Sequence, residues 1–271
     1  MTLHIARRGR PPKSASVAPA PVVRPNHEVL EDLKYRFSML GKLTTGATQS
    51  NIRAMVVSGS AGVGKTYTVE HVLEQSGTHY EVVKGTLSAL HLFKLGYKYR
   101  KRGNVVVLDD ADGIFTDEEA LNILKAALDT SKKRTIHWNT DSRLLRSEGV
   151  PNSFEFKGGA IFITNIKFDN VKSKKLRDHL EALESRCHYL DLTIDTVREK
   201  LLRIRQVVTE HGMLDDYGFE DAERNEVVEF IEANKHRMRE LSLRMVLKVA
   251  DLRVSMPTKW QAVAQVTCMR H

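Results

Sequence analysis

Cysteines and long apolar runs are scarce in this sequence. Among 271 residues only Cys187 and Cys268 are cysteines, too few for a disulfide framework and without a surrounding pattern of zinc-ligand spacing. No run of about 18 apolar residues occurs, and the arginines near the N-terminus are not followed by an apolar stretch, so we expect neither a membrane span nor a secretory signal. These absences favour a reducing, cytoplasmic compartment.

Acidic residues are missing from the first part of the chain. The formal net charge is +8 and the pI is about 9.4. Residues 1–27 contain five basic residues and no acid, so only +3 remains for everything that follows. This distribution suggests a polyanionic partner for the tail, whereas the nearly balanced remainder does not demand one.

Hydrophobic periodicity divides the chain into three parts. Residues 1–25 are rich in proline, alanine and serine, and we expect a disordered basic arm. From Asn26 strands and helices alternate: helix 26–40, strand 54–57, helix 68–75, strand 80–84, helix 89–102, strand 105–109, helix 118–129 and strand 160–164. Beyond 191 only helical periodicity remains, at 197–208, 222–233 and 239–254. The pattern predicts an α/β domain over 26–191, in which helices cover both faces of a parallel sheet. It predicts a small all-helical lid domain with a C-terminal tail over 192–271.

A glycine-rich segment follows the first expected strand. It consists of Gly59, Ser60, Ala61, Gly62, Val63, Gly64, Lys65 and Thr66. It fits G-x-x-x-x-G-K-[ST] in full at a strand-to-helix junction, where backbone N–H groups and the helix N-terminus attract phosphate. We expect Lys65 to reach the β- and γ-phosphates of ATP, and the Thr66 hydroxyl to bind Mg²⁺. The alternative is an accidental glycine-rich turn, against which the strand–loop–helix context argues.

Acidic residues end the strand predicted at 105–109. The segment Val105 to Leu108 is apolar, and Asp109, Asp110 and Asp112 follow it. Neighbouring carboxylates at the end of a buried strand repel one another unless a cation is present. We therefore expect Asp109 to hold Mg²⁺ through water and Asp110 to polarise the attacking water. The alternative is that Asp110 only caps the next turn.

The spacing of these two motifs, with one strand–helix unit between them, resembles an AAA+ ATPase over about 28–255. The resemblance implies a P-loop NTPase (AAA+) fold and ATP hydrolysis at interfaces between identical subunits of a ring. The sequence departs from the family at Asp110, where most members have glutamate. Aspartate is one methylene shorter than glutamate.

Two further segments carry the same resemblance. Residues 159–165 resemble the sensor 1 strand, in which Asn165 would orient the attacking water; an ordinary turn asparagine is the alternative. Ser185, Arg186 and Cys187 resemble the Ser-Arg-Cys segment of clamp-loader-like members, whose arginine reaches the ATP of the neighbouring subunit. Arg177 competes with Arg186 for this role, and a solvated arginine on a helix face is the third interpretation.

The helical domain also contains a candidate for a residue that contacts ATP. Met238 to Leu241 resembles the sensor 2 segment and is expected to open a helix. The resemblance implies that Arg239 contacts the γ-phosphate of its own subunit, with Arg237 and Arg244 as close alternatives.

Residues 134–158 lie outside the minimal pattern. Two short strands are expected at 135–138 and 154–156, with Arg143 and Arg146 between them. Some AAA+ groups touch DNA or a partner with a hairpin inserted here, and an ordinary polar loop is the equal alternative.

The arm contains Arg8, Gly9, Arg10 and Pro11, which resemble the AT-hook, a segment that lies in the minor groove of A·T-rich DNA. Proline keeps such a segment extended, and arginine is drawn to the negative potential of a narrow groove. A merely solubilising arm is the alternative. Together the sequence predicts an ATP-driven, ring-forming AAA+ machine that acts on DNA and not on membranes. The alternative is an AAA+ protein that remodels or threads other proteins.

Overall fold

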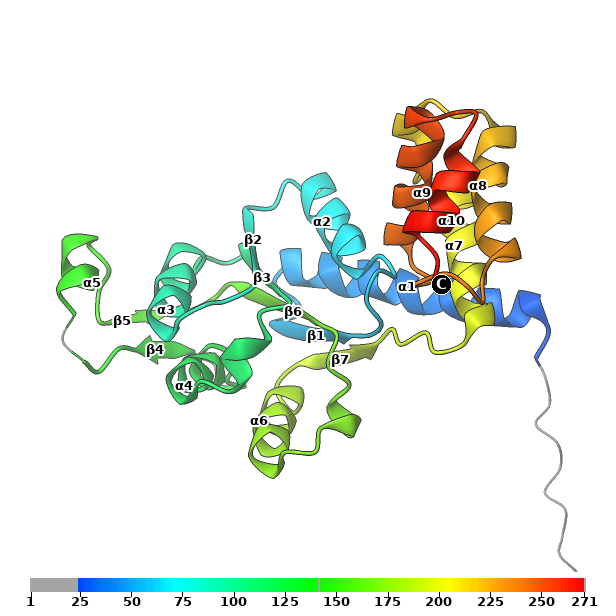
Figure 1. Cartoon of the computed structure of the whole chain (residues 1–271). Helices are drawn as coiled ribbons and strands as arrows, with labels where there is room; N and C mark the ends of the chain where they lie inside the picture. The colour runs from blue at the N-terminus through cyan, green and yellow to red at the C-terminus, as the bar shows by residue number, and fades with distance from the viewer. Residues whose placement is uncertain (1–23, 141, 271) are drawn as a thin grey trace, which may run out of the picture.

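The computed structural model describes residues 24–140 and 142–270. The AT-hook-like residues 8–11 lie outside the described residues. Figure 1 shows an α/β domain followed by an upright group of helices. No described helix is both long and apolar enough to cross a membrane.

Five parallel strands form the central sheet, in the order β2-β3-β6-β1-β7. They are β1 (Ala54–Ser58), β2 (Tyr80–Lys84), β3 (Val105–Asp109), β6 (Gly159–Thr164) and β7 (His188–Asp191). The three central strands β3, β6 and β1 are buried along their whole length, as a sheet covered on both faces requires. The parallel sheet predicted from the sequence is thereby confirmed.

Helices cover both faces of this sheet. They are α1 (Asn26–Thr48) and α2 (Lys65–Gln75) on one face, and α3 (Ala89–Lys98), α4 (Glu118–Ala127) and α6 (Lys174–Glu184) on the other. Side chains alternate along β1 accordingly. Met55 and Val57 belong to the cluster with α1 and α2, whereas Val56 belongs to the cluster with α3, α4 and α6.

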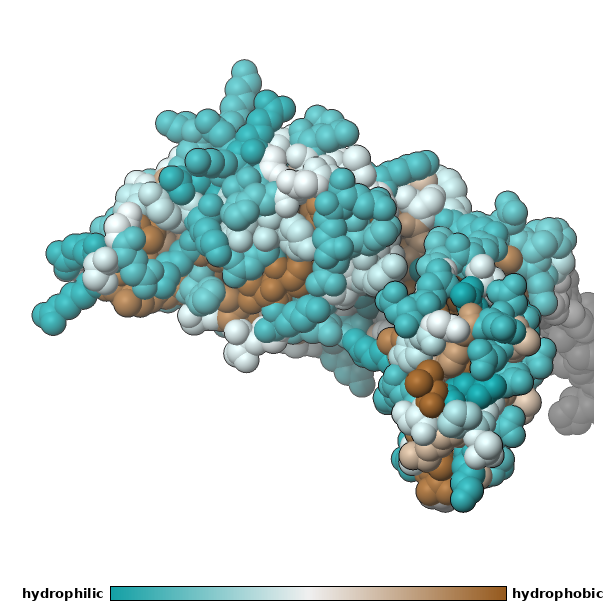
Figure 2. Space-filling model, turned by 90° about the horizontal axis from the view of Figure 1, so that it is seen from above, coloured by the Kyte–Doolittle hydropathy of each residue, from teal (hydrophilic) through white to brown (hydrophobic). Residues whose placement is uncertain are grey.

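The helices of the C-terminal part enclose a hydrophobic cluster of their own. They are α7 (Val197–Glu210), α8 (Asp221–Ala233), α9 (Leu243–Ser255) and α10 (Trp260–Thr267). The expected start of a helix at Arg239 is wrong: Ser242 caps α9 by accepting from the Met245 N–H at 3.2 Å. Seen from above, these helices carry separate apolar patches on a mainly hydrophilic surface (Figure 2). The exposed large apolar residues of this part are Val197, Leu247, Val254, Met256 and Val266.

The insertion after α4 forms a small separate sheet. Its strands β4 (Thr135–His137) and β5 (Ser153–Glu155) pair antiparallel, as expected, and a short helix, α5 (Arg143–Ser147), lies between them. Ser142 caps α5 through the Leu145 N–H. Short 3₁₀ turns complete the fold: η1 (Asp112–Phe115), η2 (Phe168–Asn170) and η3 (Asp215–Tyr217).

The strand register brings the ends of β1, β3 and β6 together. Ser58 pairs with Thr164, and Asp109 pairs with Ile163. Because the carboxyl ends of parallel strands share one edge of a sheet, the loops that follow β1, β3 and β6 meet there. The candidate site is built at this edge.

Candidate nucleotide-binding site

The loop from Gly59 to Gly64 connects β1 to α2 through backbone conformations that favour glycine. Gly62 and Gly64 have φ angles of 69° and 100°. A Cβ on Gly62 would also lie 2.7 Å from the Cβ of Ser242, the cap of α9. Glycine is therefore needed here both for the turn and for the close approach of the helical domain.

The Lys65 side chain folds back into this loop. Its Nζ donates to the carbonyl oxygens of Gly59 at 2.7 Å and Ser60 at 3.0 Å, and to Oδ1 of Asn165 at 2.9 Å. Only 6% of the residue is exposed. Burial lowers the pKa of Lys65 to about 8, although the nearby Asp110 and Asp109 carboxylates oppose this shift. Lys65 is thus a cation held at low dielectric beside the loop, where an anion would gain most from it.

Thr66 and Asp109 form a small set of oxygen ligands. The Thr66 hydroxyl donates to Oδ2 of Asp109 at 3.0 Å, and Lys84 lies 3.8 Å from the same oxygen. Mg²⁺ is typically held by one or two protein oxygens together with waters and phosphates, not by an all-protein cage. The described residues contain no cluster of three or more acidic, histidine or cysteine ligands. The two side chains fit Mg²⁺ bound jointly with a nucleotide.

Asp110 and Asn165 face each other across the ends of β3 and β6. Asn165 Nδ2 donates to Oδ1 of Asp110 at 2.8 Å, so Asn165 links Asp110 to Lys65. The Asp110 φ angle is 52°, a left-handed conformation fixed by the Asp110 N–H bond to the Ile163 carbonyl at 2.9 Å. Both side chains are exposed at this edge. The structure therefore brings together the predicted residues at the ends of three strands.

A third carboxylate, Asp112, supports this arrangement, although the sequence assigned it no role. Its Oδ1 accepts from the Thr164 hydroxyl at 2.7 Å, and the Thr164 oxygen accepts from the Ile166 N–H at 3.0 Å. Burial raises the pKa of Asp112, and the Thr164 hydrogen bond opposes the rise. Asp112 thus holds the end of β6, from which Asn165 projects.

The helical domain packs against the P-loop, and a cavity of about 810 Å³ lies between this domain and the edge of the sheet. The Leu243 N–H donates to the Gly62 carbonyl at 2.8 Å, and Arg203 Nε donates to the Val63 carbonyl at 3.3 Å. The volume lies within the usual range for ligand sites of about 300–1,000 Å³. The cavity combines cations, acids and apolar side chains, as a nucleotide with a base, a sugar and phosphates requires. Its lining includes Phe37, Gly62, Lys65, Thr66, Asp109, Asp110, Asn165, Arg203, Leu243 and Arg244.

Comparison with known proteins assigns the chain to a family. No protein-family model matches it. An uncharacterized 36.7 kDa protein from the nrdC-mobD intergenic region of Enterobacteria phage T4 is 35% identical over 247 residues, covering 88% of this chain and 76% of that protein. The chain belongs to the family of this phage protein.

Solved structures identify the fold. A point mutant of RuvB from Thermotoga maritima superposes with a TM-score of 0.50 at 18% identity, covering 88% of this chain and 70% of that one. A replication initiator DnaA structure, bound to AMPPCP and single-stranded DNA, gives a TM-score of 0.46 at 14% identity, with coverages of 90% and 66%. The likeness to RuvB, together with the strand order and the P-loop, establishes the AAA+ P-loop NTPase fold.

Arg239 lies elsewhere than the sequence suggested. It is exposed on a bend before α9 and outside the cavity lining, and its backbone pairs with the C-terminal segment through the Cys268 carbonyl at 3.0 Å. Arg244, in the first turn of α9, lines the cavity and lies close enough to Lys65 to lower the pKa of that ammonium group. Of the arginines considered for the sensor 2 position, Arg244 is therefore the one that the fold directs to the site.

Arg203 was missed by the sequence analysis. It is only 5% exposed, its guanidinium lies 3.5 Å from the centre of the Phe37 ring, and burial lowers its pKa to about 10. Its described hydrogen bonds go to the Val63 carbonyl and the Gln206 side chain, and none goes to a carboxylate. The sequence did contain a signal that Arg203 is buried. It lies four residues before Val207 and therefore on the apolar face of its helix.

Arg186 and Arg177 lie outside the cavity of their own subunit. The Arg186 guanidinium donates to the Ala182 carbonyl, and Arg177 Nη2 donates to the Val171 carbonyl at 2.7 Å. Arg186 lies two residues before β7, at the amino end of the parallel strands. Because β7 has four residues, about 13 Å of strand separates Arg186 from the carboxyl edge. Arg186 cannot serve the nucleotide site of its own chain in this arrangement.

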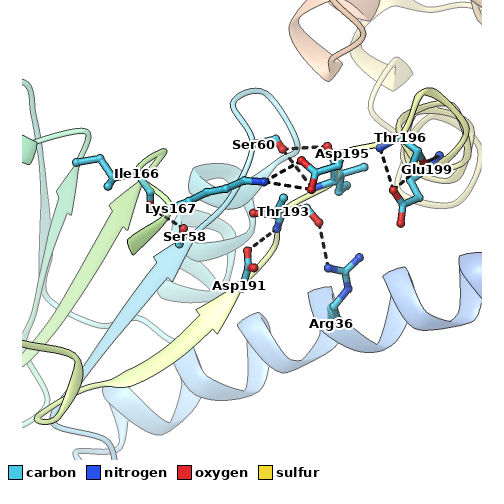
Figure 3. A network of polar contacts seen from close by, with 11 residues as sticks. Arg36, Ser58, Ser60, Ile166, Lys167, Asp191, Thr193, Asp195, Thr196 and Glu199 are labelled. Carbon is cyan, nitrogen blue, oxygen red and sulfur yellow. Dashed lines mark hydrogen bonds and ion pairs between the residues drawn. The ribbon is translucent and has the colours of Figure 1, made fainter. Parts of the chain in front are cut away.

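Hydrogen bonds and an ion pair connect residues 193–195, which link the two domains, to segments around the nucleotide site (Figure 3). The Ser60 hydroxyl of the P-loop donates to the Ile194 carbonyl at 3.0 Å, and Lys167, two residues after Asn165, pairs with Asp195 at 2.8 Å. From α1, Arg36 donates to the Thr193 carbonyl at 3.1 Å. The orientation of α7 therefore depends on the segments that would contact ATP.

Proposed function

We propose that this protein is an Mg²⁺-dependent ATPase that hydrolyses ATP at interfaces between identical subunits and acts on DNA. The observation that carries the proposal is the convergence of Lys65, Thr66, Asp109, Asp110 and Asn165 on one cavity at the edge of an AAA+ sheet.

Each residue has a chemical task in this proposal. Lys65 exchanges its loop carbonyls for the β- and γ-phosphate oxygens. Thr66 and Asp109 would hold Mg²⁺, which would offset phosphate charge. Asn165 and Asp110 position a water opposite the γ-phosphorus. As the water oxygen bonds to phosphorus, the bond to the β–γ bridging oxygen breaks and Asp110 accepts the water proton. The products are ADP and inorganic phosphate.

Arg244 is proposed as the residue of the helical domain that contacts the γ-phosphate. We expect Arg244→Ala to lower ATP turnover about 10²-fold, because it removes a charged donor from the developing phosphoryl charge. Arg239→Ala is the matched control and should change turnover less than about twofold, since Arg239 is exposed outside the cavity. Steady-state phosphate release measures both variants. The reverse ranking would return the role to Arg239.

The DNA part of the proposal rests on charge. The net charge is +8, and five of the basic residues lie in the acid-free residues 1–27, a distribution that favours a polyanionic partner. The arm residues Arg8 and Arg10 remain candidates for contacting A·T-rich DNA.

ATP turnover with and without single- and double-stranded DNA, measured beside the oligomer mass, tests the proposal. We expect Mg²⁺-dependent phosphate release that depends on oligomer formation and rises severalfold with DNA. Absence of turnover with Mg²⁺ would reject the ATPase. Turnover that no DNA changes, without DNA binding, would instead favour remodelling of proteins.

A further inference from the structure

Exposed cations gather at the amino edge of the sheet, opposite the nucleotide site. The group, termed here the basic edge, consists of Arg53, Lys101, Arg102, Lys132 and Lys133. The turn 100–104 holds three basic residues and no acid, and the turn 129–134 holds three basic residues and one acid. These turns precede β3 and β4 and follow α3 and α4 (Figure 1).

Hydrogen bonds hold these turns next to one another, so that they form one surface. Arg53, just before β1, donates to the carbonyls of Asp129 at 3.0 Å and Ser131 at 3.2 Å. The buried Arg134 donates to the Gly158 carbonyl at 3.1 Å, which places the same turn at the start of β6. The Lys157 N–H donates to the Arg100 carbonyl at 2.8 Å and joins the turn before β3. The basic edge therefore spans the starts of three neighbouring strands, about 10 Å across.

The cations of this surface have no acidic partner among residues 24–140 and 142–270. Many described lysines pair with acids, for example Lys94 with Glu148 at 2.6 Å and Lys98 with Glu81 at 2.6 Å. By contrast, Lys101, Arg102, Lys132 and Lys133 make no ion pair with any described residue and are all exposed. Unpaired like charges held side by side are unfavourable unless an anionic partner compensates them.

We propose that the basic edge binds the sugar-phosphate backbone of a nucleic acid, a step that rests on the DNA-directed function proposed above. Protein interfaces usually bury aromatic or large apolar residues at their centre. None of the exposed large apolar residues of the described chain lies in the turns of the basic edge. A surface of lysine and arginine without apolar side chains fits phosphates, which such residues contact irrespective of sequence.

The basic edge is separate from the catalytic cavity. Strand β3, with five residues, puts about 16 Å between Lys101 or Arg102 and Asp109 at its other end. None of the residues of the basic edge lines the cavity. Changes there should accordingly spare ATP binding, so the two functions can be tested apart.

The test uses the full chain with charge reversals. Lys132→Glu with Lys133→Glu forms one variant, and Lys172→Glu with Lys174→Glu forms the control, since the latter lysines are exposed, unpaired in the described chain and in a segment after β6. Binding of labelled duplex and single-stranded DNA is measured by fluorescence anisotropy from about 50 to 200 mM salt, beside basal ATP turnover without DNA. We expect the first variant to bind at least tenfold more weakly at low salt, and its slope of log K against log salt to fall by roughly 2 for duplex.

The outcomes separate the alternatives. The control should bind DNA nearly as the natural chain does. Both variants should hydrolyse ATP without DNA at the rate of the natural chain. Equal weakening of both variants, or of neither, overturns the basic edge as the binding surface and leaves the ATPase proposal untouched. Reduced basal turnover in the Lys132/Lys133 variant with unchanged DNA binding also overturns it, and assigns this edge to a contact between subunits. Comparison of duplex with single strand shows which form of the backbone the surface prefers.

Discussion

Lys65→Ala is expected to weaken ATP binding by about 10²- to 10³-fold, because it removes a buried ammonium from the phosphates. Asp110→Asn is expected to keep ATP affinity near that of the natural protein and to lower turnover by about 10²- to 10⁴-fold, because it removes only the proton acceptor. Fluorescent-nucleotide titration measures the first effect, and phosphate release measures the second.

Lys84→Ala is the matched control for Lys65. Lys84 is an exposed lysine 3.8 Å from Asp109, but it does not line the cavity. Its removal should change ATP affinity by less than about threefold. Thermal unfolding of each variant guards against a folding defect, since Lys65 also holds the loop carbonyls in the ligand-free protein. Full turnover by Asp110→Asn would mean that another group polarises the water.

The central strands could be predicted because their own residues determine them. The apolar segments of β1, β3 and β6 are rich in valine and isoleucine and are buried throughout, so local composition and burial agree. The edge strand β7 reads His-Tyr-Leu-Asp and is only half-buried. It has no apolar run of its own, and its pairing with β1, more than a hundred residues earlier, defines it.

The start of α9 was misplaced for a similar reason. Met238 and Leu241 continue the helical spacing of the residues after them, so the pattern suggested a helix from Arg239. In the structure Met238 forms a bridge with Met269 near the C-terminus. That long-range contact holds Met238 outside the helix, Arg239 lies on a bend, and Ser242 is the cap of α9. A local pattern cannot reveal a partner that is about thirty residues away.

Some residues of the candidate site could likewise be predicted from a local motif, whereas others are placed there only by tertiary contacts. Lys65, Thr66, Asp109 and Asp110 are named by contiguous motifs whose spacing reflects one strand-to-helix junction and one strand end. Arg203 and Arg244 instead reach the cavity from the helical domain, and contacts between that domain and the P-loop place them there, namely Leu243 with Gly62 and Arg203 with Val63. Asp112 gains its role from Thr164, which lies on another strand.

Arg186 is expected to act on the ATP of a neighbouring subunit. Arg186→Ala should lower turnover by about 10³-fold or more, the scale of an arginine that stabilises a transferring phosphoryl group. Arg177→Ala is the comparison variant, since Arg177 is the competing candidate and is held by the Val171 carbonyl. ATP affinity should stay nearly unchanged in both, because neither side chain lines the cavity of its own chain.

Mixing subunits decides whether Arg186 works across an interface. Arg186→Ala rings have intact P-loops but lack the arginine that would reach the neighbouring ATP. Lys65→Ala rings keep that arginine but lack a working P-loop. Neither kind of ring should therefore turn over ATP. In mixed rings some interfaces pair an intact Lys65 with an intact Arg186 of the next subunit, and we expect activity to return there. The recovered activity should depend on the mixing ratio and vanish at dilutions where the oligomer mass falls to that of the monomer. Turnover per chain that stays constant down to the monomer would contradict action in trans. It would require Arg186 to reach its own site across the length of β7, which the present arrangement forbids.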